Sequence, residues 1–237
     1  DRNICAFDVF GGEHMERKWY LDLWALIRAP FKRGIPEIVE FGTIQRGFAC
    51  AMGMLAISLL VSWIIQAVMA YSLGVSAPQL GAALGVLAGA GFFVLVLYAL
   101  SAFVTLAIYS VLFSWVANKF DAHTDYESIL KICWYQSAYS MVISLVLSIV
   151  EVILVLIVNG FNLDVYAPDI VLYIIGFSYT IFQVVAYIWC FWVSLTLMAR
   201  QIEKGRLATF GIGLLASLIP VVLIGILVGM VMLATSR

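Results

Sequence analysis

The sequence predicts an all-α membrane protein whose five transmembrane helices form a bundle. Three observations lead to this fold class: 64% of the 237 residues are hydrophobic, 11% are charged, and the mean hydropathy is +1.06. A typical soluble domain has about 25% charged residues and fewer apolar ones, so soluble folds, soluble enzymes included, are excluded. The apolar runs are continuous and do not alternate with polar residues, which favours helices over a transmembrane β-barrel.

Five stretches are long and apolar enough to cross the hydrocarbon core, which needs about 20 residues in a helix. The second stretch would be roughly 57 Å long as a helix. It has no polar turn between residues 86 and 116, so we expect a single helix there. The five predicted spans are 48–73, one within 80–117, 138–158, about 170–199 and 209–234.

The positions of the basic residues predict which helix ends face the cytoplasm. Seven Lys and Arg residues precede the first span, two follow the second and three follow the fourth, which leaves only Arg237 on the opposite side. Cytoplasmic loops carry an excess of Lys and Arg, so the N-terminus is predicted to be cytoplasmic and the C-terminus to lie across the membrane. Segment 1–47 is then a cytoplasmic N-terminal region, and 48–237 is the transmembrane domain.

The N-terminal region contains the pattern of an amphipathic helix, at about residues 15–29. Apolar side chains share one face, and charged ones, Asp22 among them, fall largely elsewhere. Such a helix suits the surface of an anionic leaflet, which makes membrane lipids a predicted partner. Packing of the same face on the helix bundle is an equally open alternative. The residues predicted to touch the membrane surface are Trp19, Leu23, Ile27 and Arg28.

Glu151 is the only charged residue well inside a predicted span. An ionisable side chain at such depth costs about 2.5–3.5 kcal/mol on insertion scales, so it faces a partner, a cavity or the bundle interior. Gln66 and Gln183 lie at comparable or greater depth in two other spans, and the three residues form a candidate intramembrane polar site. Three roles stay open: a neutral Glu151 that hydrogen-bonds a neighbouring helix, a proton, ion or substrate role, and a contact with another subunit.

Small residues at four-residue spacing predict surfaces where helices pack closely. One series on the third span leads to Glu151 on the same face, and glycine pairs of the GxxxG type occur in the second and fifth spans. These surfaces pack either within the chain or against a partner. The predicted packing residues are Ser140, Ser144, Ser148, Gly81, Gly85, Gly89, Gly225 and Gly229.

The sequence contains no recognisable catalytic or ligand-binding set. The spans contain no histidine, which excludes a haem held by two intramembrane histidines and a Ser–His intramembrane protease. The four cysteines form no CxxC pair, and no Walker motif is present. We therefore predict no enzymatic activity, no cofactor and no metal. Nucleic acid is not a predicted partner, because no basic stripe is large enough to neutralise many phosphates.

Two further sequence features suggest a family. A polar loop leads into the aromatic stretch 130–135 (LKICWY) before the third span, and the short basic loop 202–208 (IEKGRLA) precedes the last span. With five helices and a cytoplasmic N-terminus, this layout resembles the Yip family of Ypt/Rab-interacting membrane proteins over about 48–230. The short N-terminal segment is similar to that of bacterial members. The resemblance implies the bacterial cytoplasmic membrane, with the Golgi or ER membrane as the alternative, and implies no catalytic residue.

Taken with that resemblance, the sequence predicts a non-enzymatic membrane scaffold, trafficking factor or accessory subunit. Its expected partners are other membrane proteins or further copies of the chain. The rival hypothesis is a small transporter or channel subunit centred on Glu151. It is less favoured, because transporters show internal repeats or broken helices with polar midplane sites, and neither is evident in the sequence.

Overall fold

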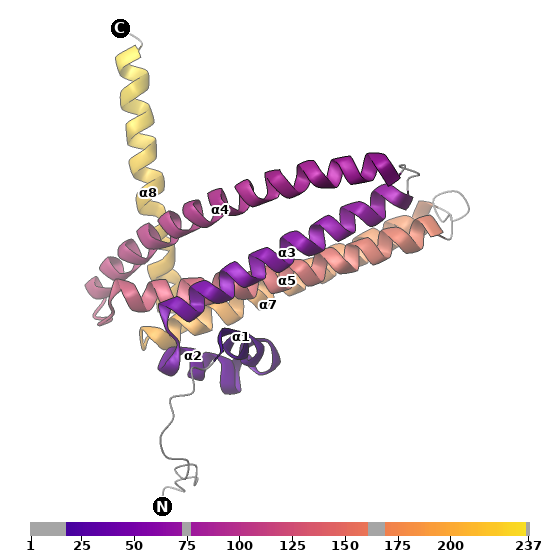
Figure 1. Cartoon of the computed structure of the whole chain (residues 1–237). Helices are drawn as coiled ribbons and strands as arrows, with labels where there is room; N and C mark the ends of the chain where they lie inside the picture. The colour runs from indigo at the N-terminus through magenta and orange to yellow at the C-terminus, as the bar shows by residue number, and fades with distance from the viewer. Residues whose placement is uncertain (1–17, 73–76, 161–168, 236–237) are drawn as a thin grey trace, which may run out of the picture.

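The computed structural model describes residues 18–72, 77–160 and 169–235, and every element within them is helical (Figure 1). Three short elements come first: α1 (Trp19–Arg28), the π-helical turn η1 (Pro30–Gly34) and α2 (Ile35–Phe41). The long helices are α3 (Ile44–Ser72), α4 (Ala77–Lys119), α5 (Tyr126–Gly160), α7 (Asp169–Gln201) and α8 (Arg206–Thr235).

Five helices in the described residues are long and apolar enough to cross a membrane, which confirms the predicted fold class. The second predicted span is one uninterrupted helix of 43 residues, α4, as expected. The helices are longer than the predicted spans because polar residues continue them beyond the apolar runs. The stretches that meet the length and hydropathy needed for crossing are Ile44–Val68, Ala99–Lys119, Tyr126–Gly160, Asp169–Gln201 and Arg206–Met232.

Side-chain caps set the starts of α3 and α5. The hydroxyl of Thr43 accepts a hydrogen bond from the backbone N–H of Arg46 at 3.2 Å. The carboxylate of Asp125 accepts one from the backbone N–H of Ser128 at 2.8 Å. Hydrogen bonds from Ser128 lower the pKa of Asp125, because they stabilise its ionised form. Both helices therefore begin several residues before the apolar run that they carry.

Buried side chains gather at one end of the molecule, which we call the base. The base comprises α1, η1, α2, the first part of α3, the last parts of α4 and α7, and the first parts of α5 and α8. Its core includes Trp134 and Tyr135 of α5 and Phe113 of α4, each at most 2% exposed. Among the described side chains of α5 beyond Tyr139, only Leu147 is buried.

The N-terminal elements share this core with the membrane spans. Leu23 and Leu26 of α1 and Ile35 and Ile38 of α2 are all buried in it. The ammonium group of Lys131, near the start of α5, also donates a hydrogen bond to the backbone carbonyl of Val39 at the end of α2, at 3.0 Å. The N-terminal segment is therefore bound to the transmembrane helices rather than separate from them.

The spans are joined at the base but do not all run together (Figure 1). Helices α3, α5 and α7 lie side by side, α4 stands apart from α3 along much of its length, and α8 leaves the base in another direction. Thr209, Ile212 and Ala216 are buried near the start of α8, and none of its described side chains is buried beyond them. Lipid tails are as apolar as leucine, so only packing and polar contacts hold helices together in a bilayer.

The charge asymmetry in the sequence predicts the orientation of this fold. Arg46, Lys119 and Lys204 belong to helix ends or loops at the base (Figure 1), so we expect the base to face the cytoplasm. A single cysteine at Lys204 should react with a membrane-impermeant maleimide only after sealed right-side-out membranes are permeabilised. One at Asn159, at the far end of α5, should react before permeabilisation. Equal reactivity of the two positions, or the reverse order, would contradict this orientation.

The labelling experiment needs a protein whose native cysteines do not react with the maleimide. Cys50, Cys133 and Cys190 are buried in the structure, so they should contribute little signal. Cys5 is the fourth native cysteine, and replacing it by serine removes its thiol. The background protein without an added cysteine is the control.

Candidate functional site: a polar groove between α3 and α5

A polar groove of about 590 Å³ runs along the contact between α3 and α5. Each helix contributes small polar side chains at four-residue spacing, so each presents one polar stripe to the groove. Apolar side chains of both helices complete the walls. The polar lining residues are Ser58, Ser62 and Gln66 of α3 and Ser140, Ser144, Ser148 and Glu151 of α5.

The hydroxyl groups of the groove are only partly satisfied within the chain. The Oγ atom of Ser58 is buried and has no hydrogen-bond partner among the described residues. The amide of Gln66 donates to the Ser62 hydroxyl at a long 3.5 Å, and Ser140 donates to the backbone carbonyl of Ser137 at 2.9 Å. The hydrocarbon core supplies no water to satisfy such groups. The groove therefore offers hydrogen bonds to whatever molecule fills it.

Glu151 lies at the end of the α5 stripe with its side chain exposed. One of its carboxyl oxygens accepts a hydrogen bond from the hydroxyl of Tyr179 on α7, at 3.3 Å. The same hydroxyl lies 3.0 Å from the backbone carbonyl of Leu147, which also accepts from it. The carboxyl thus has a weak, shared donor and retains acceptor capacity toward the groove.

The structure brings together two of the three residues predicted to form an intramembrane polar site. Gln66 and Glu151 line the same groove. Gln183 lies on α7, outside the lining, and is a hydrogen-bonding neighbour of Tyr179. It is therefore linked to Glu151 through that tyrosine rather than placed beside the carboxyl.

The groove ends where the base begins. Met54 of α3 and Ala138 and Tyr139 of α5, directly below the lining, are each at most 7% exposed and belong to the packed core. In the described residues the polar lining therefore does not continue through the base. The groove opens sideways along the helices and is not a channel that crosses them.

The predicted glycine surfaces have different outcomes. Gly81, Gly85, Gly89 and Gly229 belong to helices, but their surroundings lie outside what the structure describes. A Cβ atom on Gly225 would meet nothing within 4 Å, so this glycine packs against no described part of the chain. Helix α8 lies apart from the other helices here, and the packing role of Gly225 stays a prediction.

The apolar face of α1 packs on the bundle, which was one of its two predicted alternatives. Leu23 is 5% exposed, so this side chain is not available to a leaflet. Trp19 is partly buried and packs against the core. Ile27 and Arg28 are exposed, as a surface role requires. Helix α1 can pack this closely because Gly53 of α3 has no Cβ atom. A Cβ atom at Gly53 would lie 2.8 Å from the Trp19 ring.

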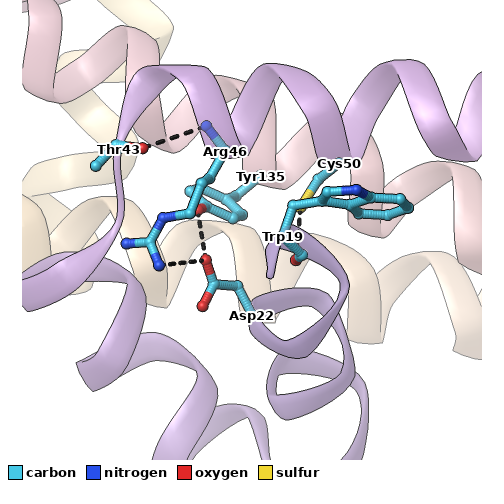
Figure 2. A network of polar contacts seen from close by, with 6 residues as sticks. All are labelled: Trp19, Asp22, Thr43, Arg46, Cys50 and Tyr135. Atoms are coloured by element: carbon cyan, nitrogen blue, oxygen red, sulfur yellow. Dashed lines mark hydrogen bonds and ion pairs between the residues drawn. The ribbon is translucent and has the colours of Figure 1, made fainter. Parts of the chain in front are cut away.

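A buried polar network fixes α1 to α3 and α5 (Figure 2). The Asp22 side chain is 3% exposed, and one of its oxygens accepts a hydrogen bond from the Tyr135 hydroxyl at 2.8 Å. The same oxygen lies 3.5 Å from a guanidinium nitrogen of Arg46. The thiol of Cys50 donates to the backbone carbonyl of Trp19 at 3.2 Å. The carboxylate is thus buried with a cation and a hydroxyl donor, which burial of a charge requires.

Sequence reasoning missed this network and half of the groove. Asp22 comes three residues after Trp19 and four before Leu26, so it belongs to the inward stripe of α1 and not to its polar side. Ser58 and Ser62 repeat on α3 the four-residue spacing that was recognised only on α5. Both signals are present in the sequence.

No family model matches the chain, and neither the search of curated proteins nor the search of solved structures finds a match. The resemblance to the Yip family is therefore untested by these comparisons and stays a prediction.

The packing of Trp19 on Gly53 leads to a testable consequence for Cys50. In Gly53→Leu the added side chain should displace the Trp19 ring and loosen α1, which covers the Cys50 thiol. Overpacking costs about 1–3 kcal/mol, so the population with Cys50 uncovered should rise roughly 5- to 150-fold. N-ethylmaleimide labelling of the detergent-solubilised protein, mapped by peptide mass spectrometry, measures this rate.

Gly176→Leu is the matched control, because a Cβ on that glycine meets nothing within 4 Å. Its labelling rate at Cys50 should equal that of the wild type. If Cys50 stays equally protected in Gly53→Leu, Trp19 does not hold α1 over it.

Proposed function

We propose that this chain is a non-enzymatic scaffold or accessory subunit of a membrane complex, and that it holds one transmembrane helix of a partner protein in the groove between α3 and α5. The observation that carries the proposal is the pair of facing polar stripes, which ends in Glu151 and is closed at the base. The partner helix is expected to have small residues at four-residue spacing and a hydrogen-bonding side chain opposite Glu151.

The dimensions of the groove suit a helix. The α5 stripe from Ser140 to Glu151 has twelve residues, which rise about 16 Å or three helical turns. Serine side chains are small, so a partner backbone can approach closely and exchange hydrogen bonds with them. A lipid acyl chain would leave the exposed carboxyl of Glu151 without a new partner, at a free-energy cost. A polar helix supplies that partner.

The second candidate is a small transporter or channel subunit centred on Glu151. The polar lining of the groove favours it, because intramembrane carboxylates mark many ion and substrate pathways. Alternating access needs a site reachable from both sides, whereas the described groove stops at the packed residues Met54, Ala138 and Tyr139. This closure is why we place the scaffold first.

Orientation and location belong to the same proposal. The base is expected to face the cytoplasm, and the host membrane is expected to be a bacterial cytoplasmic membrane, with the Golgi or ER membrane as the alternative. Support comes from the charge asymmetry and from the resemblance to bacterial Yip proteins. The finding that stands independently of both is a multi-pass helical membrane protein.

Site-specific photocrosslinking in native membranes tests the helix-docking proposal. A photoreactive residue at Ser144, inside the groove, should give one discrete protein adduct, and one at Val146, an exposed position outside the lining, should not. Glu151→Leu should lower the yield of the Ser144 adduct about 3- to 20-fold, because intramembrane hydrogen bonds are worth about 0.6–1.7 kcal/mol. Glu151→Gln, which keeps the shape and hydrogen-bonding capacity, should retain most of it.

The outcomes separate the alternatives. An adduct with twice the mass of the chain would identify the occupant as a second copy. Lipid adducts alone from Ser144 would contradict helix docking. Proton flux in vesicles of the purified wild type that disappears in Glu151→Gln would replace the scaffold by the transporter, because only the carboxyl can release a proton.

A further inference from the structure

A second cavity lies at the base, and it shares no lining residue with the α3–α5 groove. It has a volume of about 1030 Å³ and is bounded by α2, the last turns of α7 and the first residues of α8. Its walls are partly apolar, with Pro36, Val39 and Ala199, and partly charged. The proposed docking of a helix in the groove does not involve this cavity, so a ligand of the cavity can be tested independently of it.

Three cations converge on the cavity from consecutive turns of the chain. Arg200 belongs to the end of α7, Lys204 to the connection, and Arg206 to the start of α8. Two carboxylates, Glu40 and Glu203, also line it, which leaves the lining with a net charge of +1. In the described part of the chain, no ion pair within 4.0 Å joins these carboxylates to the three cations. The cations are therefore available to an anion from outside.

The backbone at this point adds to the positive potential. Gly205, Arg206 and Leu207 line the cavity at the start of α8, a helix of 30 residues. The backbone N–H groups of a first helical turn have no partner within the helix, and they favour a negative charge nearby. These N–H groups add to the positive potential of the three cations, which remain the main anion-binding groups of the cavity.

Exposed aromatic and aliphatic side chains place the cavity at the height of lipid headgroups. Trp115, Trp189 and Trp192 are all exposed at the base, as tryptophans at a membrane–water interface are. The Trp192 ring lines the cavity and lies 4.6 Å from the Arg206 guanidinium, measured to the ring centroid, which holds that cation in place. Leu207 is 88% exposed beside it. Apolar walls and cations together suit an amphiphilic anion.

We propose that this cavity binds the phosphodiester headgroup of a monoanionic glycerophospholipid. Arg200 and Lys204 would pair with the phosphate oxygens, and the apolar wall around Leu207 would contact the start of the acyl chains. The net charge of +1 fits one negative charge better than a phosphomonoester or a polyphosphate. Inorganic phosphate has the same anionic group as the lipid but lacks its apolar part. Competition between phosphatidylglycerol and inorganic phosphate therefore distinguishes a lipid site from a site for free phosphate.

The test is a titration of the delipidated full chain in detergent, followed by native mass spectrometry, with phosphatidylglycerol as the probe. The wild type should bind one phosphatidylglycerol more tightly than phosphatidylcholine of the same acyl chains. Arg200→Gln and Lys204→Gln should each weaken phosphatidylglycerol binding about fivefold, and the double variant about 30-fold, because each cation near an anionic lipid contributes roughly that factor.

Lys32→Gln with Lys119→Gln is the matched control, since it removes two exposed cations of the base that do not line the cavity. It should leave the affinity within about twofold of the wild type. Three results would overturn the proposal: equal binding of phosphatidylcholine, an equal loss in the control, and displacement of phosphatidylglycerol by inorganic phosphate. The single variants keep the test decisive if the double variant fails to fold.

Discussion

The buried carboxylate of Asp22 is the contact on which the arrangement of the base depends. A charge removed from water is stable only with a counter-charge and hydrogen-bond donors close to it. Arg46 on α3 and the Tyr135 hydroxyl on α5 supply these within 3.5 Å and 2.8 Å. Because the carboxylate must reach both, α1 can dock in one register only, and this docking also brings Trp19 over Gly53 and its backbone carbonyl to Cys50.

The fixed base explains why a groove exists further along the helices. Helices α3 and α5 are held together where the core packs, and beyond it their facing residues are too small to fill the space between them. Water would drive apolar helices together at such a point, but lipid does not. The same division of the molecule produces two different surfaces. One is the polar groove along the spans, where we propose that a helix binds, and the other is the cationic cavity at the base, where we propose that a headgroup binds.

The sequence predicted the features that follow from composition and from the spacing of residues along a helix. It did not predict the contacts between segments that are far apart in the chain. Continuous apolar runs were sufficient for five spans, and the isolated Glu151 was sufficient to identify one end of the groove. The partner stripe at Ser58 and Ser62 could have been found from its spacing alone. The hydrogen bond between Asp22 and Tyr135, which are 113 residues apart, could not have been found in this way. The spacing of hydrophobic residues shows which face of a helix is buried, but not which residues of another helix pack against that face. Caps at Thr43 and Asp125 set where α3 and α5 begin, several residues before the apolar run of each helix.

A double-mutant cycle between Asp22 and Tyr135 tests most directly whether this contact anchors the base. The unfolding free energy in mixed detergent micelles is measured for the wild type, Asp22→Ala, Tyr135→Phe and the double variant. A hydrogen bond to a buried charged group contributes about 1.5–3 kcal/mol, so we expect a coupling energy in that range between the two sites. Additive effects, with a coupling of less than about 0.5 kcal/mol, would contradict the anchoring role of Asp22.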